Sequence, residues 1–343
     1  MSSNAYQTSP CLYLESNNVK IGSNRDAGGC VTEIIYRNVY NFVNVCDLGR
    51  EVQTATFWST NGVAYNPDEG GAESNPANTP NLNSPCLVLE NQGNTQVSLC
   101  NPKEWSASVF GLGYVYDWIK LGKHATIVGD GIVQYQTDVI NDRSIQHDGL
   151  YQVEIPSIYT VQQMCRYYGY DAGSDSVQEF QVGNFASGDI NQYHKQYSPA
   201  SGAGGVIVSS PDQLWALGIY GGQGAVDYFT LWSFINAPPG ADQHLDWPCS
   251  KLTAVKIENA NPLPAGTYAY TSYLVMGTVG EVQSKMRALY TGAPLPQAGG
   301  NPPPSPAPTP TVTSTGGNAY RLTIQPTPSS VVVNGDKSIS IVM

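Results

Sequence analysis

Short runs of alternating polar and apolar residues, separated by turn residues, recur along most of this chain. The segment GDGIVQYQTDVIND, residues 129–142, shows the alternation most clearly. A period of two residues places one face of a β-strand in a core and the other face in solvent. Because such strands recur with turns between them, residues 1–293 are predicted to form one antiparallel β-supersandwich. Further strand-like runs lie at residues 11–22, 30–36, 40–46, 86–90, 96–100, 106–110, 151–155, 206–209, 214–220, 228–235 and 268–276.

One helix is predicted, near the end of this region. Thr278 and Glu281 have the spacing of a capping box, in which each side chain bonds the other residue's backbone N–H. The residues that then share one helical face are Val279, Val282, Met286 and Leu289. We expect this helix to pack across an edge or the back of a sheet.

The composition changes after the helix. Residues 294–317 are rich in Pro, Thr and Ser, which is typical of an extended, solvated linker between domains. Residues 318–343 resemble the opening of a bacterial Ig-like β domain, and about 25 residues are too few to close such a sandwich. The linker therefore indicates a possible further domain.

The charge balance excludes several partner classes. The 343 residues carry 16 basic and 27 acidic side chains, a net charge of −11, and contain no basic run. Nucleic acid and anionic membranes are therefore poor partners, and no apolar run is long enough for membrane insertion. Only 13% of the residues are charged, which suits a secreted or cell-surface β-protein. MSSNAYQTSP is not a signal peptide, so the signal has been replaced, export follows another route, or the protein stays inside the cell.

The seven cysteines leave two interpretations open. Cys30 and Cys46 lie symmetrically about Asn38, and Cys86 and Cys100 lie symmetrically about Gly93. In hairpins of matching register each pair would be within disulfide reach. The alternative is buried free thiols that pack as small hydrophobic groups.

The first candidate site follows a predicted hairpin with its turn at Arg37-Asn38. Gly28-Gly29 precede the first strand of this hairpin and allow a bulge or the close approach of another backbone. Polar residues and aromatics after a strand pair are typical of ligand contacts. The alternative is a structural tie between Asp47 and Arg50. The candidates of this group are Asp47, Arg50, Gln53 and Trp58.

The second candidate site lies in DRSIQHDGLYQVEIPSIYT. A histidine beside carboxylates and a tyrosine is a plausible acid–base set, although a lone histidine in a β-turn, such as His147, is more often a polar turn residue. Downstream, PPGADQHLDWPCS carries a tryptophan that either stacks on a sugar or caps the core. The residues of interest in these two segments are Arg143, His147, Asp148, Glu154, Tyr159, His244 and Trp247.

No cofactor or metal is predicted. The chain contains no GxGxxG, P-loop, HExxH, GxSxG or paired CxxC motif. Residues 59–85 are predicted to form a long surface loop. Its acids Asp68, Glu69 and Glu73 are interpreted as solvated rather than as ligands of a hard cation, because no Asp-x-Asp-x-Asp spacing occurs.

Five segments together resemble a group of secreted bacterial proteins with the galactose-mutarotase-like supersandwich, a fold also used by polysaccharide lyases and several glycoside hydrolases. The segments are GSNRDAGGCVTEI, NFVNVCDLGREVQTATFW, YQVEIPSIY, QLWALGIYG and AYTSYLVMGTVGEVQSKMRALY. The resemblance covers residues 12–291 in patches and implies a cleft formed by Asp47, Arg50, Gln53, Glu154 and Tyr159. The chain departs from the pattern where it has Gln-Val-Glu instead of Gln-Glu, which affects the role of Glu154.

The favoured function is an extracellular carbohydrate-active enzyme that acts on a polysaccharide or oligosaccharide. A lyase would use Tyr159 or His147 as the base and Arg50 or Arg143 to neutralise a uronate carboxylate. A hydrolase would use Glu154 with Asp47 or Asp148. The alternatives are a non-catalytic glycan-binding protein, with Trp58 and Trp247 stacking on sugars, and a structural extracellular subunit. For catalysis, we expect one concave surface to hold Asp47, Arg50, Gln53, His147, Glu154 and Tyr159.

Overall fold

A computed structural model describes residues 10–44, 51–71, 83–105, 111, 113–183, 193–234 and 249–298, together with four short strands between residues 311 and 342. The chain divides into two compact units, Met1–Gly300 and Asn301–Met343. In the second unit β22 (Thr311–Ser314) pairs with β23 (Tyr320–Thr323), and β24 (Ser330–Val333) pairs with β25 (Ile339–Val342), both antiparallel. Strand β22 lies within the stretch expected to be linker.

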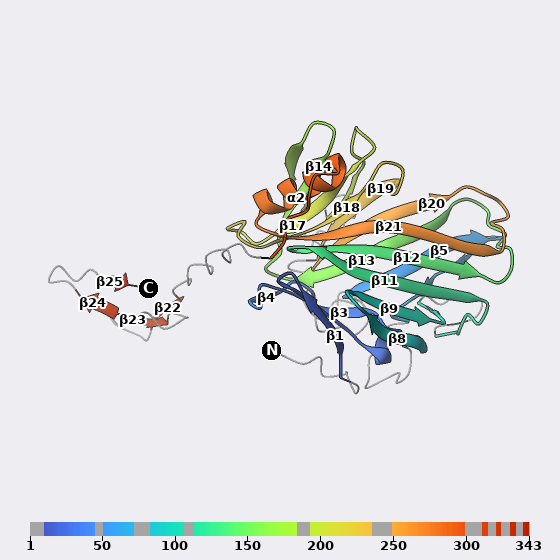
Figure 1. Cartoon of the computed structure of the whole chain (residues 1–343), viewed down its shortest axis with the longest axis horizontal. Helices are drawn as coiled ribbons and strands as arrows, with labels where there is room; N and C mark the ends of the chain where they lie inside the picture. The colour runs from blue at the N-terminus through green and yellow to red at the C-terminus, as the bar shows by residue number, and fades with distance from the viewer. Residues whose placement is uncertain are drawn as a thin grey trace. The chain divides into compact units, whose positions relative to one another are not determined.

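The first unit is an antiparallel β-supersandwich, as the alternating pattern predicted (Figure 1). One layer, the large sheet, has twelve strands. Its main path runs β1 (Leu12–Ser16), β2 (Val19–Ser23), β3 (Val31–Tyr36), β5 (Val52–Thr60), β13 (Tyr151–Val161), β20 (Cys249–Glu258), β19 (Tyr228–Ser233) and β16 (His194–Tyr197). The short strands β4 (Tyr40–Asn41), β6 (Val63–Tyr65), β7 (Pro67–Asp68) and β10 (Lys103–Glu104) pair beside this path.

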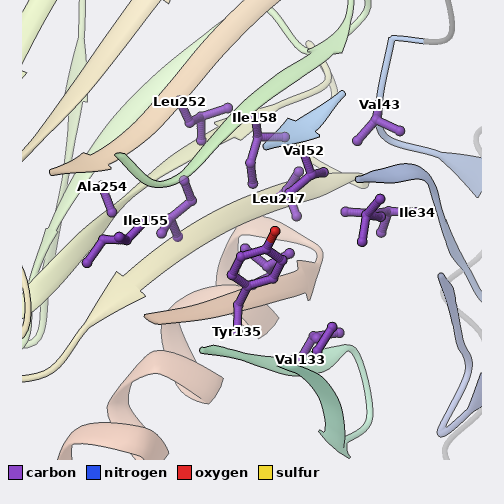
Figure 2. Close-up of a cluster of buried hydrophobic side chains, with 14 of the residues drawn as sticks. Ile34, Val43, Val52, Val133, Tyr135, Ile155, Ile158, Leu217, Leu252 and Ala254 are labelled. Atoms are coloured by element: carbon purple, nitrogen blue, oxygen red, sulfur yellow. The ribbon is translucent and has the colours of Figure 1, made fainter. Parts of the chain in front are cut away.

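The second layer is a nine-stranded sheet. Its order is β15 (Ser176–Phe180), β14 (Arg166–Asp171), β17 (Gly204–Ser209), β18 (Ala216–Gly221), β21 (Gly266–Gly277), β12 (Ile132–Asn141), β11 (Ile119–Gly129), β9 (Thr95–Cys100) and β8 (Cys86–Gln92). The core lies between the two sheets. In Figure 2, Ile34, Val52 and Ile158 from the large sheet lie in one cluster with Val133 and Tyr135 from the nine-stranded sheet, and all are buried.

The predicted helix is α2 (Val279–Thr291), and its N-terminus has the expected capping box between Thr278 and Glu281. Its buried residues Val279, Val282 and Met286 pack on the outer side of the nine-stranded sheet, in a cluster with Ile207 and other residues. Figure 1 shows α2 beside β17 and β18. This is the one α-helix in the part of the chain that the structure describes, and no helix there is long and apolar enough to cross a membrane.

The chain continues to contact the first unit beyond the predicted boundary at residue 293. The backbone N–H of Asp130, in the turn between β11 and β12, donates to the carbonyl of Pro296 over 2.7 Å. The N–H of Ala298 donates to Oδ1 of Asn17, in the turn between β1 and β2, over 3.2 Å. Residues 296–298 are therefore tied to one turn of each sheet, a connection that the Pro-rich composition did not indicate.

Two further local predictions concern the first hairpin. Arg37 and Asn38 both have positive φ angles, 52° and 56°, and form the expected turn. Gly28 has a φ of 66°, and a Cβ there would overlap the carbonyl oxygen of Glu69. The predicted close approach of another backbone is thus the chain that leaves β7.

Residues 59–71 are not the predicted surface loop. They form the end of β5 and the strands β6 and β7, and Asp68 and Glu69 are buried rather than solvated. Glu69 Oε1 lies 3.7 Å from Nζ of Lys123, a fully buried lysine on β11. Lys123 also donates to Ser23 Oγ over 3.2 Å, so this ion pair connects the two sheets.

The cysteines follow the free-thiol interpretation where the structure describes them. Cys86 and Cys100 are paired directly across β8 and β9, as the symmetric spacing predicted, but both thiols are free. Their sulfur atoms face different carbonyl oxygens, those of Val88 and Glu69. Cys30 is also free and fully buried, while Cys46 lies outside the described residues.

Candidate functional site

A pocket of about 180 Å³ lies on the large sheet. Val52 and Trp58 on β5 face the core, so the alternate residues Gln53, Ala55 and Phe57 face away from it, toward the pocket. The pocket is therefore on the outer face of the large sheet. Its walls are Gln53, Ala55, Phe57, Asn66, Asp68, Trp105, Gln152, Glu154, Tyr159 and Lys251.

A bulge in β13 brings Glu154 and Tyr159 to the same face. Five positions separate them, and in a regular strand residues an odd number apart point to opposite faces. The pairing with β5 shifts by one residue between Glu154 and Ser157: Glu154 is opposite Ala55, and Ser157 is opposite Gln53. The extra residue restores the phase, so that both polar side chains line the pocket while Ile158 stays in the core.

Lys251 connects these two residues. Its Nζ lies 3.2 Å from Oε1 and 3.4 Å from Oε2 of Glu154, and 5.3 Å from the centroid of the Tyr159 ring. Burial disfavours the charged form of Lys251, but Glu154 and Tyr159 outweigh burial, and the pKa of Lys251 is raised. The pocket therefore contains a protonated ammonium group, that of Lys251, in contact with the Glu154 carboxylate.

Gln53 presents an unsatisfied acceptor. Only 2% of the residue is exposed, and its Oε1 is buried without a hydrogen-bond partner among the described residues. Buried polar atoms in folded proteins are nearly always hydrogen-bonded, so an exception in a pocket wall indicates a group that a ligand satisfies. By contrast, the neighbouring Gln152 accepts from the Tyr228 hydroxyl over 3.1 Å.

A second carboxylate lies across the pocket from Glu154. Glu154 is opposite Ala55, and Ala55 is opposite Asp68 on β7, so one strand separates the two acids. With adjacent strands about 4.8 Å apart, the two Cα atoms are about 10 Å apart. Asp68 Oδ1 accepts from the N–H of Gly70 over 3.0 Å, which fixes its side chain.

Sequence reasoning missed most of the pocket wall. Besides Ala55, which lies between the two acids, the residues it did not identify are Asn66, Asp68, Trp105, Gln152 and Lys251. The loop predicted over residues 59–85 would have left Asp68 in solvent. Lys251 has one usable signal, since a lone lysine alternates with apolar residues in CSKLTAV. Its pairing with Tyr159 spans 92 positions along the chain and has no local signature.

His147 is not one of the residues that line the pocket. It is 1% exposed, and its ring nitrogens Nδ1 and Nε2 lie 2.6 Å and 2.8 Å from the carbonyl oxygens of Gly149 and Ala260. The ring therefore ties two turns together, which corrects its interpretation as an acid–base residue. Asp148, the alternative hydrolase carboxylate, is exposed and accepts from the N–H of Gly62 over 3.0 Å.

Trp58 is a core residue instead of a sugar-stacking one. It is 3% exposed, and its ring stacks on Tyr65 and Tyr151 with centroids 5.1 Å and 5.4 Å apart. Arg143 is exposed, and its guanidinium carbon lies 4.0 Å from the ring centroid of Trp118. Both side chains thus pack on aromatic rings of the protein, and neither lines the pocket.

Of the remaining candidates, Asp47, Arg50, His244 and Trp247 lie outside the described residues. The structure thus brings together three of the six residues expected on one concave surface: Gln53, Glu154 and Tyr159. Within the described ranges, no group of three or more His, Cys, Asp or Glu residues is arranged to hold a metal ion.

No protein-family model matches the chain, and no curated protein matches it in sequence. Three solved structures with similar backbones share 8–9% sequence identity with it. A protein from Synechocystis sp. PCC 6803 has a TM-score of 0.44, and the match covers 81% of this chain and 99% of that protein. A galactose mutarotase-like protein from Clostridium acetobutylicum has a TM-score of 0.40, covering 78% and 95%. Galactose 1-epimerase from Lactobacillus acidophilus also has 0.40, covering 78% and 93%.

The likeness concerns the backbone, and the chemistry of the pocket is interpreted from its own residues.

Proposed function

We propose that this chain is a carbohydrate-active enzyme that binds one sugar unit of a glycan in the pocket on the outer face of the large sheet. The observation that carries the proposal is the convergence of Glu154, Asp68, Tyr159 and Lys251 on that pocket. Aromatic walls with a few carboxylate and amide groups suit a sugar, which has apolar C–H faces and hydroxyl edges. Here the aromatic walls are Phe57 and Trp105.

The favoured reaction is glycoside hydrolysis by the two carboxylates. Hydrolysis needs one carboxyl group to protonate the leaving oxygen and another to act as base or nucleophile on the sugar. Cα atoms about 10 Å apart are compatible with carboxyl groups about 6.5–9.5 Å apart, the separation that leaves room for a water molecule in inverting enzymes. A carboxylate beside a charged ammonium group, such as that of Lys251, is suited to act as the base. We therefore assign the role of base to Glu154 and that of proton donor to Asp68.

A second candidate reaction is β-elimination by a lyase, which the contact between Tyr159 and Lys251 favours. A phenol oxygen beside an ammonium group is suited to remove the proton next to a uronate carboxyl, and Lys251 would balance the developing charge. His147 plays no part in this route, since both of its ring nitrogens face backbone carbonyls. A non-catalytic glycan-binding pocket is the remaining alternative.

We also propose that the protein is secreted or displayed at a cell surface, where its partner is a polysaccharide or oligosaccharide. The support is the low fraction of charged residues and the Pro/Thr/Ser-rich stretch after residue 298, which suits a spacer to a possible further domain. Fractionation of the source cells with antibody detection tests the location. Recovery in the cytosol alone would overturn it.

The enzyme proposal is tested by incubating the protein with a panel of neutral, acidic and amino polysaccharides. New reducing ends without ultraviolet absorbance indicate hydrolysis, and reducing ends with the absorbance of unsaturated uronates indicate elimination. Saccharide binding without either product supports the binding-module alternative. Neither product formation nor binding with any polymer would overturn the proposal.

A further inference from the structure

We infer that the pocket selects a neutral or amino sugar and rejects a uronate. This inference rests on the proposed function, because it specifies the sugar class for the same pocket. Its first support is charge: the described lining residues include two carboxylates, Asp68 and Glu154, but one ammonium group, that of Lys251. Lys251 already contacts both oxygens of Glu154.

The second support is the kind of hydrogen bond that the pocket needs. The buried Oε1 of Gln53 has no partner among the described residues and can only accept a hydrogen bond. A sugar hydroxyl, an amide N–H or an ammonium group supplies the missing donor, whereas a carboxylate has no donor to offer. The unsatisfied acceptor therefore calls for a donor group on the ligand, and the excess of carboxylates separately favours a ligand without negative charge.

A uronate is repelled both inside the pocket, by nearby carboxylates, and at longer distance, by the net charge of the chain. Within the pocket its carboxylate would add a third negative charge near the two already there, and like charges at such distances repel strongly where water is partly excluded. Outside it, the chain carries a net charge of −11, which repels an anionic polymer at distance. Elimination needs a uronate, so this selectivity favours hydrolysis over the lyase route.

The test uses three matched sets of monosaccharides that differ at one position. Glucose, galactose and mannose are compared with their uronates and with their 2-amino derivatives by ligand-observed NMR at low ionic strength. We expect at least one neutral or amino sugar to bind about tenfold or more tightly than the matching uronate, with a smaller ratio at high salt. Equal or tighter uronate binding would overturn the selectivity and leave the sugar pocket standing. Binding by no member of any set would overturn both.

Two glutamine variants test the role of the Gln53 acceptor. Gln53→Met removes the unsatisfied oxygen at nearly constant volume, so sugar affinity should fall about tenfold while thermal stability stays equal or rises. The matched control is Gln96→Met, because Gln96 is equally buried, lies outside the pocket lining and has partners, including Ser23 and the carbonyl of Leu12. That variant should lose stability and keep its sugar affinity. Loss of stability without loss of affinity in Gln53→Met would make Gln53 a structural residue.

A charge variant tests the selectivity itself. Asp68→Asn removes one negative charge at constant shape and leaves the ion pair of Lys251 with Glu154 in place. The ratio of neutral-sugar to uronate affinity should fall about tenfold. A ratio that does not change, in a variant with an unchanged circular dichroism spectrum, would show that charge does not set the preference.

Discussion

Glu154 and Tyr159 project from the same face of β13 although an odd number of residues separates them, because a bulge between them shifts the register by one residue. Lys251 then contacts both from the adjacent strand β20. The catalytic proposal depends on this relationship. Without the bulge, one of the two side chains would point into the core.

The first prediction concerns turnover. Glu154→Gln and Tyr159→Phe each remove a proton-transfer group at nearly constant shape, and each should lower kcat at least about 100-fold if its group acts as general acid or base. The assay is reducing-end release from the polysaccharide identified in the panel. Glu90→Gln, an exposed carboxylate on β8, is the matched control and should keep full activity. A loss of less than about tenfold for both pocket variants would argue against catalysis there.

His147→Ala should act on stability and not on turnover. The variant removes two contacts, to the carbonyl oxygens of Gly149 and Ala260, that join two turns. A net loss of about 1–3 kcal/mol is expected when buried acceptors lose their partners. Urea unfolding measures the loss, and kcat is measured on the folded fraction. Normal stability together with inactive enzyme would restore the acid–base interpretation of His147.

The ion pair of Lys123 with Glu69 should be costly to break from one side. Both side chains are buried, with at most 2% exposure, and removing one partner leaves an uncompensated charge. Lys123→Met alone should therefore lower the free energy of unfolding by about 3–5 kcal/mol. The double variant with Glu69→Gln should lose less than the sum of the two single losses, as a double-mutant cycle would show. Additive losses would mean that the pair makes no mutual contribution.

Alkaline pH should destabilise the fold through its buried tyrosines. Burial is the largest cause that raises the pKa of Tyr40 and Tyr167 to about 12, from the ordinary tyrosine value of 10.0. Because the folded pKa is higher, their stabilising contribution is complete below pH 10.0 and is lost as the pH rises toward 12. Denaturant unfolding across this range should show the decrease. Phenolate absorbance that appears at about pH 10 from these two residues in a fully folded protein would contradict it.

The thiols should differ in reactivity by depth. Cys30 and Cys100 are fully buried, and burial followed by the nearby Glu69 raises the pKa of both thiols. An alkylating reagent should therefore leave them unmodified in the native protein and label them after denaturation. Burial also raises the pKa of the Cys165 thiol, but this residue is partly exposed, so it should react natively and faster after denaturation. Peptide mapping by mass spectrometry locates the labels. A peptide that joins Cys86 to Cys100 by a disulfide would support the alternative of a bridged hairpin.

The local features of the fold could be predicted from the sequence. The capping box at Thr278, the turn at Arg37-Asn38 and the need for glycine at position 28 depend on residues close in sequence or on one backbone constraint. The alternation in β12 likewise reports burial directly, because each side chain faces either the core or the outside. These signals also sufficed for the fold class.

The candidate site could be predicted only in part. Gln53 and Trp58 lie an odd number of residues apart on β5, whose pairing with β13 is regular from Ala55 to Phe57. Residues an odd number apart in a regular strand face opposite sides of the sheet. Their spacing therefore already indicated that the two side chains could not both face one pocket. The pairing of β5, β7, β13 and β20 is long-range, and it decides which acids meet. Asp68 and Lys251 could not be placed without it, because nothing near them in the sequence specifies their neighbours.

The attachment of residues 296–298 has a mechanical consequence. A pull on the chain beyond this point would first load the Asp130–Pro296 and Asn17–Ala298 hydrogen bonds, one on a turn of each sheet. The tension would thus enter both layers of the sandwich at once, and α2, which lies before this point in the chain, would be shielded from being peeled off its sheet.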